Sequence, residues 1–117
     1  MTSADRRREL RAEYEQRPTE PAVYLVRNTV TGRALLTSAL DLRTVRNKLE
    51  FARATNLAGA LDGRLTADVR EYGIEAFQLE VLDTLEVKPE ATRADVIADL
   101  GALEDLWREK LAAEPLY

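Results

Sequence analysis

Catalysis in this chain would have to rest on tyrosine, serine, threonine, lysine, arginine or carboxylate side chains. The 117 residues contain neither histidine nor cysteine, which removes the commonest general base, thiol nucleophiles, zinc and iron–sulfur sites, and disulfides. An ion held by oxygen ligands, such as Mg²⁺, is compatible with this composition. The sequence also lacks a P-loop and the GxGxxG, HExxH and GxSxG motifs. No local motif therefore fixes a reaction.

Basic side chains gather in two segments where they could contact the phosphate groups of a nucleic acid. The first segment is the run Arg6, Arg7 and Arg8 near the start of the chain. The second segment lies between residues 41 and 54, and its basic residues are Arg43, Arg46, Lys48 and Arg53. A polar, solvated helix face is the alternative explanation of both segments.

Charge is divided unevenly along the chain. Basic residues number 17 and acidic residues 21, which gives a net charge of −4. Residues 1–70 hold 13 basic and 9 acidic groups, whereas residues 71–117 hold 4 basic and 12 acidic groups. Only the first part could attract phosphate, so DNA is one candidate partner of that part.

No feature of the sequence suggests a membrane segment or a secretion signal. No apolar run approaches the roughly 20 residues that a helix needs to span a bilayer. The start of the chain is polar and charged, unlike a signal peptide. We therefore expect a cytoplasmic protein that does not associate with a membrane.

The hydrophobic pattern predicts one α+β domain in which helices cover a small antiparallel sheet. The predicted element order is α-β-β-α-α-β-α. Helices are predicted over residues 3–16, 41–54, 58–72 and 93 to about 112, and strands over 22–28, 33–38 and 76–84. Residues 1–19 then form a helical extension, and residues 20–117 form the domain.

Local signals set the limits of these elements. Asp41 is the predicted N-cap of the second helix, and Thr92 with Asp95 predicts a capping box at the start of the last helix. Gly59 and Gly63 weaken the first turns of the third helix.

Apolar side chains recur at the spacing of each element and predict which faces are buried. In the last strand, alternation directs Phe77, Leu79 and Val81 inward. The helical stripes are Leu42, Val45, Leu49 and Ala52 in the second helix, and Val96, Leu100, Leu103, Trp107 and Leu111 in the last helix.

Several short segments, taken in order, resemble the GIY-YIG nuclease domain. They are Ala22-Val-Tyr24, the turn ending in Thr31-Gly32-Arg33, Asp41-Leu42, Val69-Arg-Glu-Tyr-Gly73 with Phe77-Gln-Leu-Glu-Val-Leu82, and Leu103-Glu104 with Trp107. The resemblance covers residues 20 to about 112 and is to small bacterial members of the family. It implies an α+β nuclease fold and, where the site is intact, metal-dependent cleavage of nucleic acid.

The resemblance assigns two site residues. Tyr24 stands at the tyrosine of the first signature, and Glu104 stands at the glutamate that binds Mg²⁺ or Mn²⁺ in the family. From the residues alone, Tyr24 is also explained as a packed strand tyrosine. Glu104 is also explained as half of a solvated acidic pair with Asp105.

Other positions of the family site are lost. Leu35 stands where the second signature has its general-base tyrosine, and Val45 stands where the helix has its arginine. Arg43 and Arg46 are the neighbouring arginines on that helix, but at about 100° per residue they point to different faces.

Apolar residues at such positions predict a closed cleft. The residues expected to fill this former cleft are Leu35, Val45, Leu49 and Trp107. Burial of each side chain could contribute roughly 1.5–3 kcal/mol. Trp107 is also explained as an ordinary core residue.

The resemblance and the losses together predict a catalytically degenerate GIY-YIG-like domain, which acts as a nucleic-acid- or protein-binding module without a cofactor. DNA would bind the basic first part, and a protein or a second copy of the chain would bind the former cleft. The alternative is a metal-dependent endonuclease in which Tyr24, Glu104 and a displaced Arg43 or Arg46 act with Mg²⁺ or Mn²⁺. The sequence does not separate the binding module from a purely structural helper.

Overall fold

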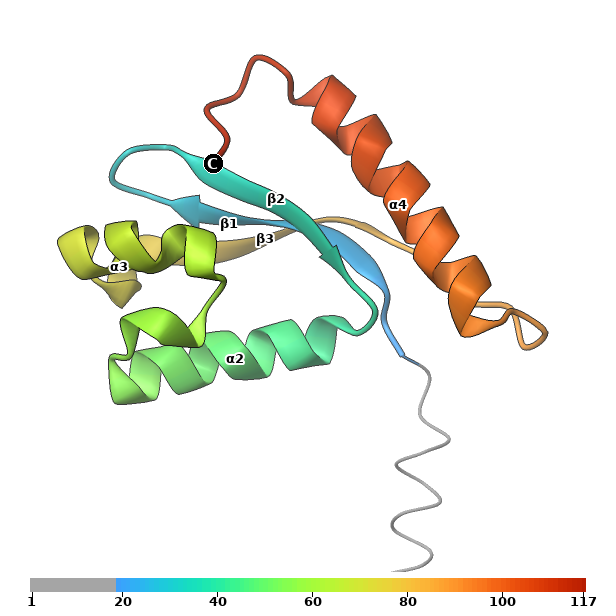
Figure 1. Cartoon of the computed structure of the whole chain (residues 1–117), viewed down its shortest axis with the longest axis horizontal. Coiled ribbons are helices and arrows are strands. Elements are labelled where there is room, and N and C mark those ends of the chain that lie inside the picture. Colours follow the sequence, from blue (N-terminus) through green and yellow to red (C-terminus); the bar gives the residue numbers. More distant parts are fainter. Residues whose placement is uncertain (1–18) are drawn as a thin grey trace, which may run out of the picture.

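The computed structural model describes residues 19–117, which form one three-stranded sheet with helices on both faces (Figure 1). The α+β class and the small antiparallel sheet are as predicted. The helix predicted over residues 3–16 lies outside the described residues, and so do Arg6, Arg7 and Arg8. None of the helices within residues 19–117 is long and apolar enough to cross a membrane.

The sheet has the strand order β2-β1-β3, and both neighbouring pairs are antiparallel. The strands are β1 (Ala22–Asn28), β2 (Ala34–Ala39) and β3 (Phe77–Thr84). The run of valine, tyrosine and leucine in β1 suits a central strand, because a central strand is buried on both faces. Between β1 and β2 the chain turns with Gly32 at φ 80°, a conformation that glycine adopts without steric cost.

Two long helices begin at the caps that the sequence predicts. Helix α2 (Leu42–Thr55) starts after Asp41, whose side chain accepts a hydrogen bond from the backbone N–H of Arg43. Helix α4 (Arg93–Lys110) starts with the complete capping box of Thr92 and Asp95. These caps satisfy N–H groups that the helix itself leaves without partners.

The helix predicted over residues 58–72 is wrong in its first half. The segment contains two short 3₁₀ turns, η1 (Ala58–Ala60) and η2 (Gly63–Leu65), and only then helix α3 (Thr66–Tyr72). Asp62 breaks the helix because its side chain caps a new turn by accepting from the N–H of Arg64. A last turn, η3 (Ile74–Ala76), leads from α3 into β3.

The two faces of the sheet carry separate cores. Tyr24, Val26 and Leu35 face α2 and α3, where their neighbours include Leu49 and Phe77. The other face packs against α4, and its core residues are Val23, Leu25, Ala34, Leu36, Leu82, Leu103, Trp107, Leu111 and Leu116. Figure 1 shows this arrangement, with α2 and α3 on one side of the sheet and α4 on the other.

This division corrects the prediction of a single apolar cleft. Leu35, Val45 and Leu49 belong to the core beneath α2, whereas Trp107 belongs to the core beneath α4. Trp107 donates its indole N–H to a carboxylate oxygen of Asp83 at 3.3 Å. The sheet therefore separates Trp107 from the other three residues, and they cannot close one cleft together.

The two edges of the sheet differ in how they are covered. On the β2 edge, the N–H of Ala34 donates to the Pro115 carbonyl and the N–H of Tyr117 donates to the Ala34 carbonyl, each at 2.9 Å. Arg108 donates to the Leu36 carbonyl at 3.5 Å. On the β3 edge, Val81 is 40% exposed, so its predicted inward position is wrong. It lines a cavity between β3 and α2 and is not packed in the core.

Candidate functional site

A cavity of about 450 Å³ lies between β2, the start of α2 and the η1–η2 segment. Tyr24 of the central strand lines it, together with apolar and polar side chains. The apolar lining is Val26, Leu35, Ala39, Leu40, Val45, Ala60, Leu61 and Leu65. The polar lining is Thr37, Ser38, Asp41, Thr44, Lys48 and Asp62. This is where the structure places the first signature tyrosine and two of the lost positions.

Tyr24 is 9% exposed, and its hydroxyl has no hydrogen-bond partner within residues 19–117. Burial raises the pKa of this hydroxyl, and the negative charges of Asp62 and Glu104 raise it further, while Arg64 opposes them. The hydroxyl is therefore neutral at ordinary pH and can donate or accept a hydrogen bond, but it is a poor general base.

Asp62 and Arg64 form a two-pronged ion pair beside the cavity. Nε of Arg64 lies 2.9 Å from Oδ1 of Asp62, and Nη2 lies 2.8 Å from Oδ2. The hydrogen bonds from the Arg64 side chain and backbone lower the pKa of Asp62 to about 2, with a smaller contribution from the charge of Lys48. The carboxylate is thus ionised and already bound to a cation.

Removing this charge should weaken the fold in a pH-dependent way. The pKa of Asp62 is lower in the folded chain than in the unfolded one, so its stabilisation exists above pH 4 and disappears as the pH falls toward 2. We expect Asp62→Asn, which keeps a capping oxygen, to cost about 0.5 kcal/mol at pH 7, since the pair is largely exposed. Thermal unfolding of the wild type and Asp62→Asn at pH 7 and pH 2 measures this effect. A stability difference between the two that is as large at pH 2 as at pH 7 would contradict it.

Glu104 does not line the cavity, although its negative charge affects the pKa of Tyr24. It lies on α4, and its carboxylate pairs with Arg108 at 3.5 Å, one helical turn later. Its negative charge contributes to the raised pKa of Tyr24 and to that of Arg64. Tyr24, Arg64 and Glu104 therefore interact electrostatically, although they come from three separate elements.

Asp62 and Arg64 are the site residues that sequence reasoning missed. A continuous helix over 58–72 would not set these two residues apart from their neighbours. The signal that could have found them is Asp62 followed by Gly63, a pair that favours a turn in place of a helix. The turn carries Arg64 to within electrostatic reach of Tyr24.

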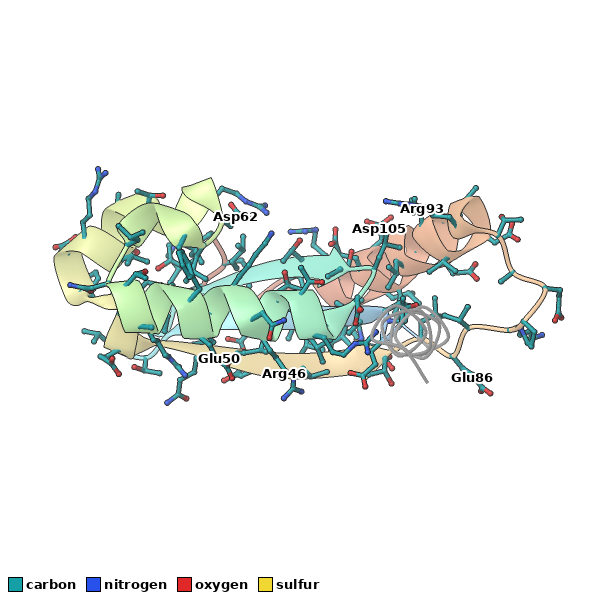
Figure 2. All side chains as sticks on the ribbon, turned by 90° about the horizontal axis from the view of Figure 1, so that it is seen from below. Arg46, Glu50, Asp62, Glu86, Arg93 and Asp105 are labelled. Atoms are coloured by element: carbon teal, nitrogen blue, oxygen red, sulfur yellow. The ribbon has the colours of Figure 1, made fainter. Side chains whose placement is uncertain are left out.

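The basic side chains of α2 do not form one face. Arg43 pairs with Asp41 at 2.9 Å, and Lys48 lines the Tyr24 cavity. Arg46 and Arg53 line a second cavity, of about 410 Å³, next to β3, and Figure 2 shows Arg46 on the side of α2 away from Asp62. The four cations expected to track phosphates are therefore divided among different surroundings.

A metal ion would have few ligands here. Within residues 19–117, no group of three or more acidic side chains is placed to hold one. Glu104 and Asp62 are each engaged by an arginine, and Mg²⁺ sites depend on carboxylates that are available to the ion. The residues present therefore do not fit a divalent-cation centre.

Comparison of this chain with protein-family models, with curated proteins and with solved structures finds no match. The arrangement around Tyr24 thus stands on its own geometry. It consists of a neutral hydroxyl in a cavity with an apolar floor, and carboxylates that are already paired with arginines. Within residues 19–117, the carboxylates nearest Tyr24 are thus engaged by arginines, and the cavity beside it is lined by both apolar and polar side chains.

Proposed function

We propose that this chain is a GIY-YIG-like domain that binds a protein partner and does not cleave nucleic acid. One observation carries the proposal, namely that within residues 19–117 the carboxylates lining the Tyr24 cavity are already paired with arginines. The second signature position is Leu35, which is 1% exposed in the core. The two carboxylates that line the cavity, Asp41 and Asp62, pair with Arg43 and Arg64, and that of Glu104 pairs with Arg108. A water molecule beside Tyr24 would therefore meet carboxylates whose basicity an arginine already lowers.

The charge of the described part favours a protein over a nucleic acid. Residues 19–117 hold 12 basic and 17 acidic side chains, and a net negative domain repels phosphate at long range. The basic residues of α2 are also divided between two cavities and an ion pair. A cytoplasmic location remains part of this proposal, in keeping with a charged chain that contains no cysteine.

A second candidate function is a metal-dependent endonuclease with an atypical site. The observation in its favour is the electrostatic interaction of Tyr24, Arg64 and Glu104. In this version Arg64 would supply the cation that stabilises the transition state, in place of Arg43 or Arg46. It is the weaker candidate because the carboxylates of Asp62 and Glu104 already pair with Arg64 and Arg108.

A plasmid-nicking assay with Mg²⁺ or Mn²⁺ separates the two candidates. We expect the same background nicking from the wild type, Tyr24→Phe and Glu104→Gln. The exposed neighbour Asp105 provides the control variant Asp105→Asn. Nicking that requires the metal, is lost in Tyr24→Phe and Glu104→Gln, and survives in Asp105→Asn would establish the endonuclease.

The nature of the partner is tested by fluorescence anisotropy with labelled duplex DNA over a series of salt concentrations. We expect no saturable binding at physiological salt, because the domain carries net negative charge. Tight binding whose affinity falls steeply with salt would instead assign a nucleic-acid partner. The outcome of the plasmid-nicking assay would be interpreted independently of this result.

A further inference from the structure

The outer edge of β3 is open at Leu79 and Val81, whereas the Phe77 carbonyl at the start of the strand accepts from Arg53 at 2.9 Å. In β1, the backbone groups of Asn28 bond toward the β2 side, to Arg33 and Gly32. Hydrogen-bonding direction alternates along an antiparallel strand. Arg27 and Leu25 of β1 therefore bond to their β3 partners, Gln78 and Glu80. The N–H and C=O groups of Leu79 and Val81 then point away from the sheet, and within residues 19–117 they have no backbone partner.

Apart from Arg53 at the Phe77 carbonyl, this edge lacks the usual protection against pairing. Proteins commonly shield an edge strand with lysine, proline or a covering segment. Residues 77–81 contain neither lysine nor proline, and the register shift in the β1–β3 pairing lies beyond Val81. The β2 edge, in contrast, is covered by Pro115, Tyr117 and Arg108.

We infer that the β3 edge is the surface through which a second copy of this chain binds, by antiparallel β3–β3 pairing across a two-fold axis at Leu79. In this register each Leu79 bonds to its counterpart through both its N–H and its carbonyl. The Phe77 carbonyl, which faces the partner's Val81, keeps its bond from Arg53. The side-chain pairs are Leu79 with Leu79, Phe77 with Val81, and Gln78 with Glu80. All of these pairs are favourable or neutral.

Neighbouring registers are worse. An axis at Glu80 sets two glutamates directly opposite each other, which is destabilising. An axis at Val81 sets the apolar Leu79 opposite the charged Asp83. The sequence of β3 therefore selects one register for its pairing with itself.

Helix α2 adds charge complementarity to this pairing. It runs antiparallel to β3, because Leu42 bonds to Glu20 beside the start of β1, whereas Arg53 bonds to the Phe77 carbonyl at the start of β3. The two-fold axis then sets two α2 helices antiparallel on one side of the joined sheet.

Opposite charges meet between these two helices. Arg46 and Glu50 both line the cavity beside Leu79, and Figure 2 shows both on the β3 side of α2. Neither has an ion-pair partner within residues 19–117. Across the axis, Arg46 of each copy lies opposite Glu50 of the other, and this match favours a second copy over an unrelated strand.

Analytical ultracentrifugation of the full chain over a range of concentrations tests the inference. We expect a monomer–dimer equilibrium that Glu50→Arg and Arg46→Glu each weaken by about tenfold. The double exchange Arg46→Glu/Glu50→Arg should return the dissociation constant to within about threefold of the wild type. Glu71→Arg, which makes the same charge change on the exposed side of α3, should have no effect.

Amide hydrogen exchange locates the interface. The Leu79 amide should gain protection as the concentration rises, while the Gln78 and Glu80 amides, bonded to β1, stay protected throughout. A chain that remains monomeric, or a dimer whose dissociation constant does not change with the charge exchanges, would overturn the inference. Protection of the β3 amides that appears only when a different protein is added would also overturn it. Failure of this inference and failure of the proposed function are distinguishable, because the nicking assay uses Tyr24→Phe and Glu104→Gln, which change neither α2 nor β3.

Discussion

Replacing Phe77 by alanine is expected to lower the free energy of unfolding by about 3–5 kcal/mol. Phe77 is fully buried and packs in the core between the sheet and α2. Its removal leaves a cavity that rigid strands cannot close, so the lost burial and the cavity both contribute. Urea unfolding followed by circular dichroism measures the change.

Phe51 provides the matched control for this substitution. It lies on α2 but is 55% exposed, so Phe51→Ala removes the same atoms from a largely solvated position. We expect a change below about 0.5 kcal/mol there. Equal losses at the two positions would mean that the core does not lie where the structure places it.

Replacing Asn28 by alanine is expected to cost about 2–3 kcal/mol. Asn28 is the one buried polar residue of the described part of the chain. Its side-chain oxygen accepts from the N–H groups of Val30, at 3.0 Å, and Thr31, at 3.4 Å. Its amide nitrogen donates to the Tyr117 hydroxyl at 3.4 Å. Alanine would leave these groups without a partner at the turn between β1 and β2.

Asn47 is the control, because it is an exposed asparagine in the middle of α2. Asn47→Ala should stabilise the fold by about 0.5 kcal/mol, since alanine has the higher helix propensity. The two asparagines thus predict opposite signs in the same unfolding experiment. A loss of stability at both positions, or at neither, would contradict the role given to Asn28.

Elements with local signals could be predicted from the sequence. Strand β1 has the predicted limits, and the limits of α2 differ from the prediction by one residue. Helix α4 begins at the predicted residue. Caps and periodicity lie within the elements themselves, so they can be read without knowing the rest of the fold.

Features that depend on distant segments could not be predicted. The broken helix around Asp62, the exposure of Val81 and the separation of Trp107 from Leu35 all follow from where other elements lie. The same is true of the site, because Arg64 and Glu104 reach Tyr24 from elements whose positions the sequence does not state. Spacing along the chain predicts which residues share a helix face, but it does not predict which residues of distant elements lie next to one another.

The hydrogen bonds between residues 115–117 and β2 also determine which parts of the sheet can form first. Pro115 and Tyr117 bond to Ala34 across more than 80 positions of sequence, whereas β1 and β2 are joined by a short turn. The hairpin closes a small loop and can form within microseconds, but its outer edge is covered only after residues 115–117 have been added. On the ribosome, the β2 edge therefore stays open until residue 117 has been made, and in that interval chaperones or neighbouring nascent chains can reach it.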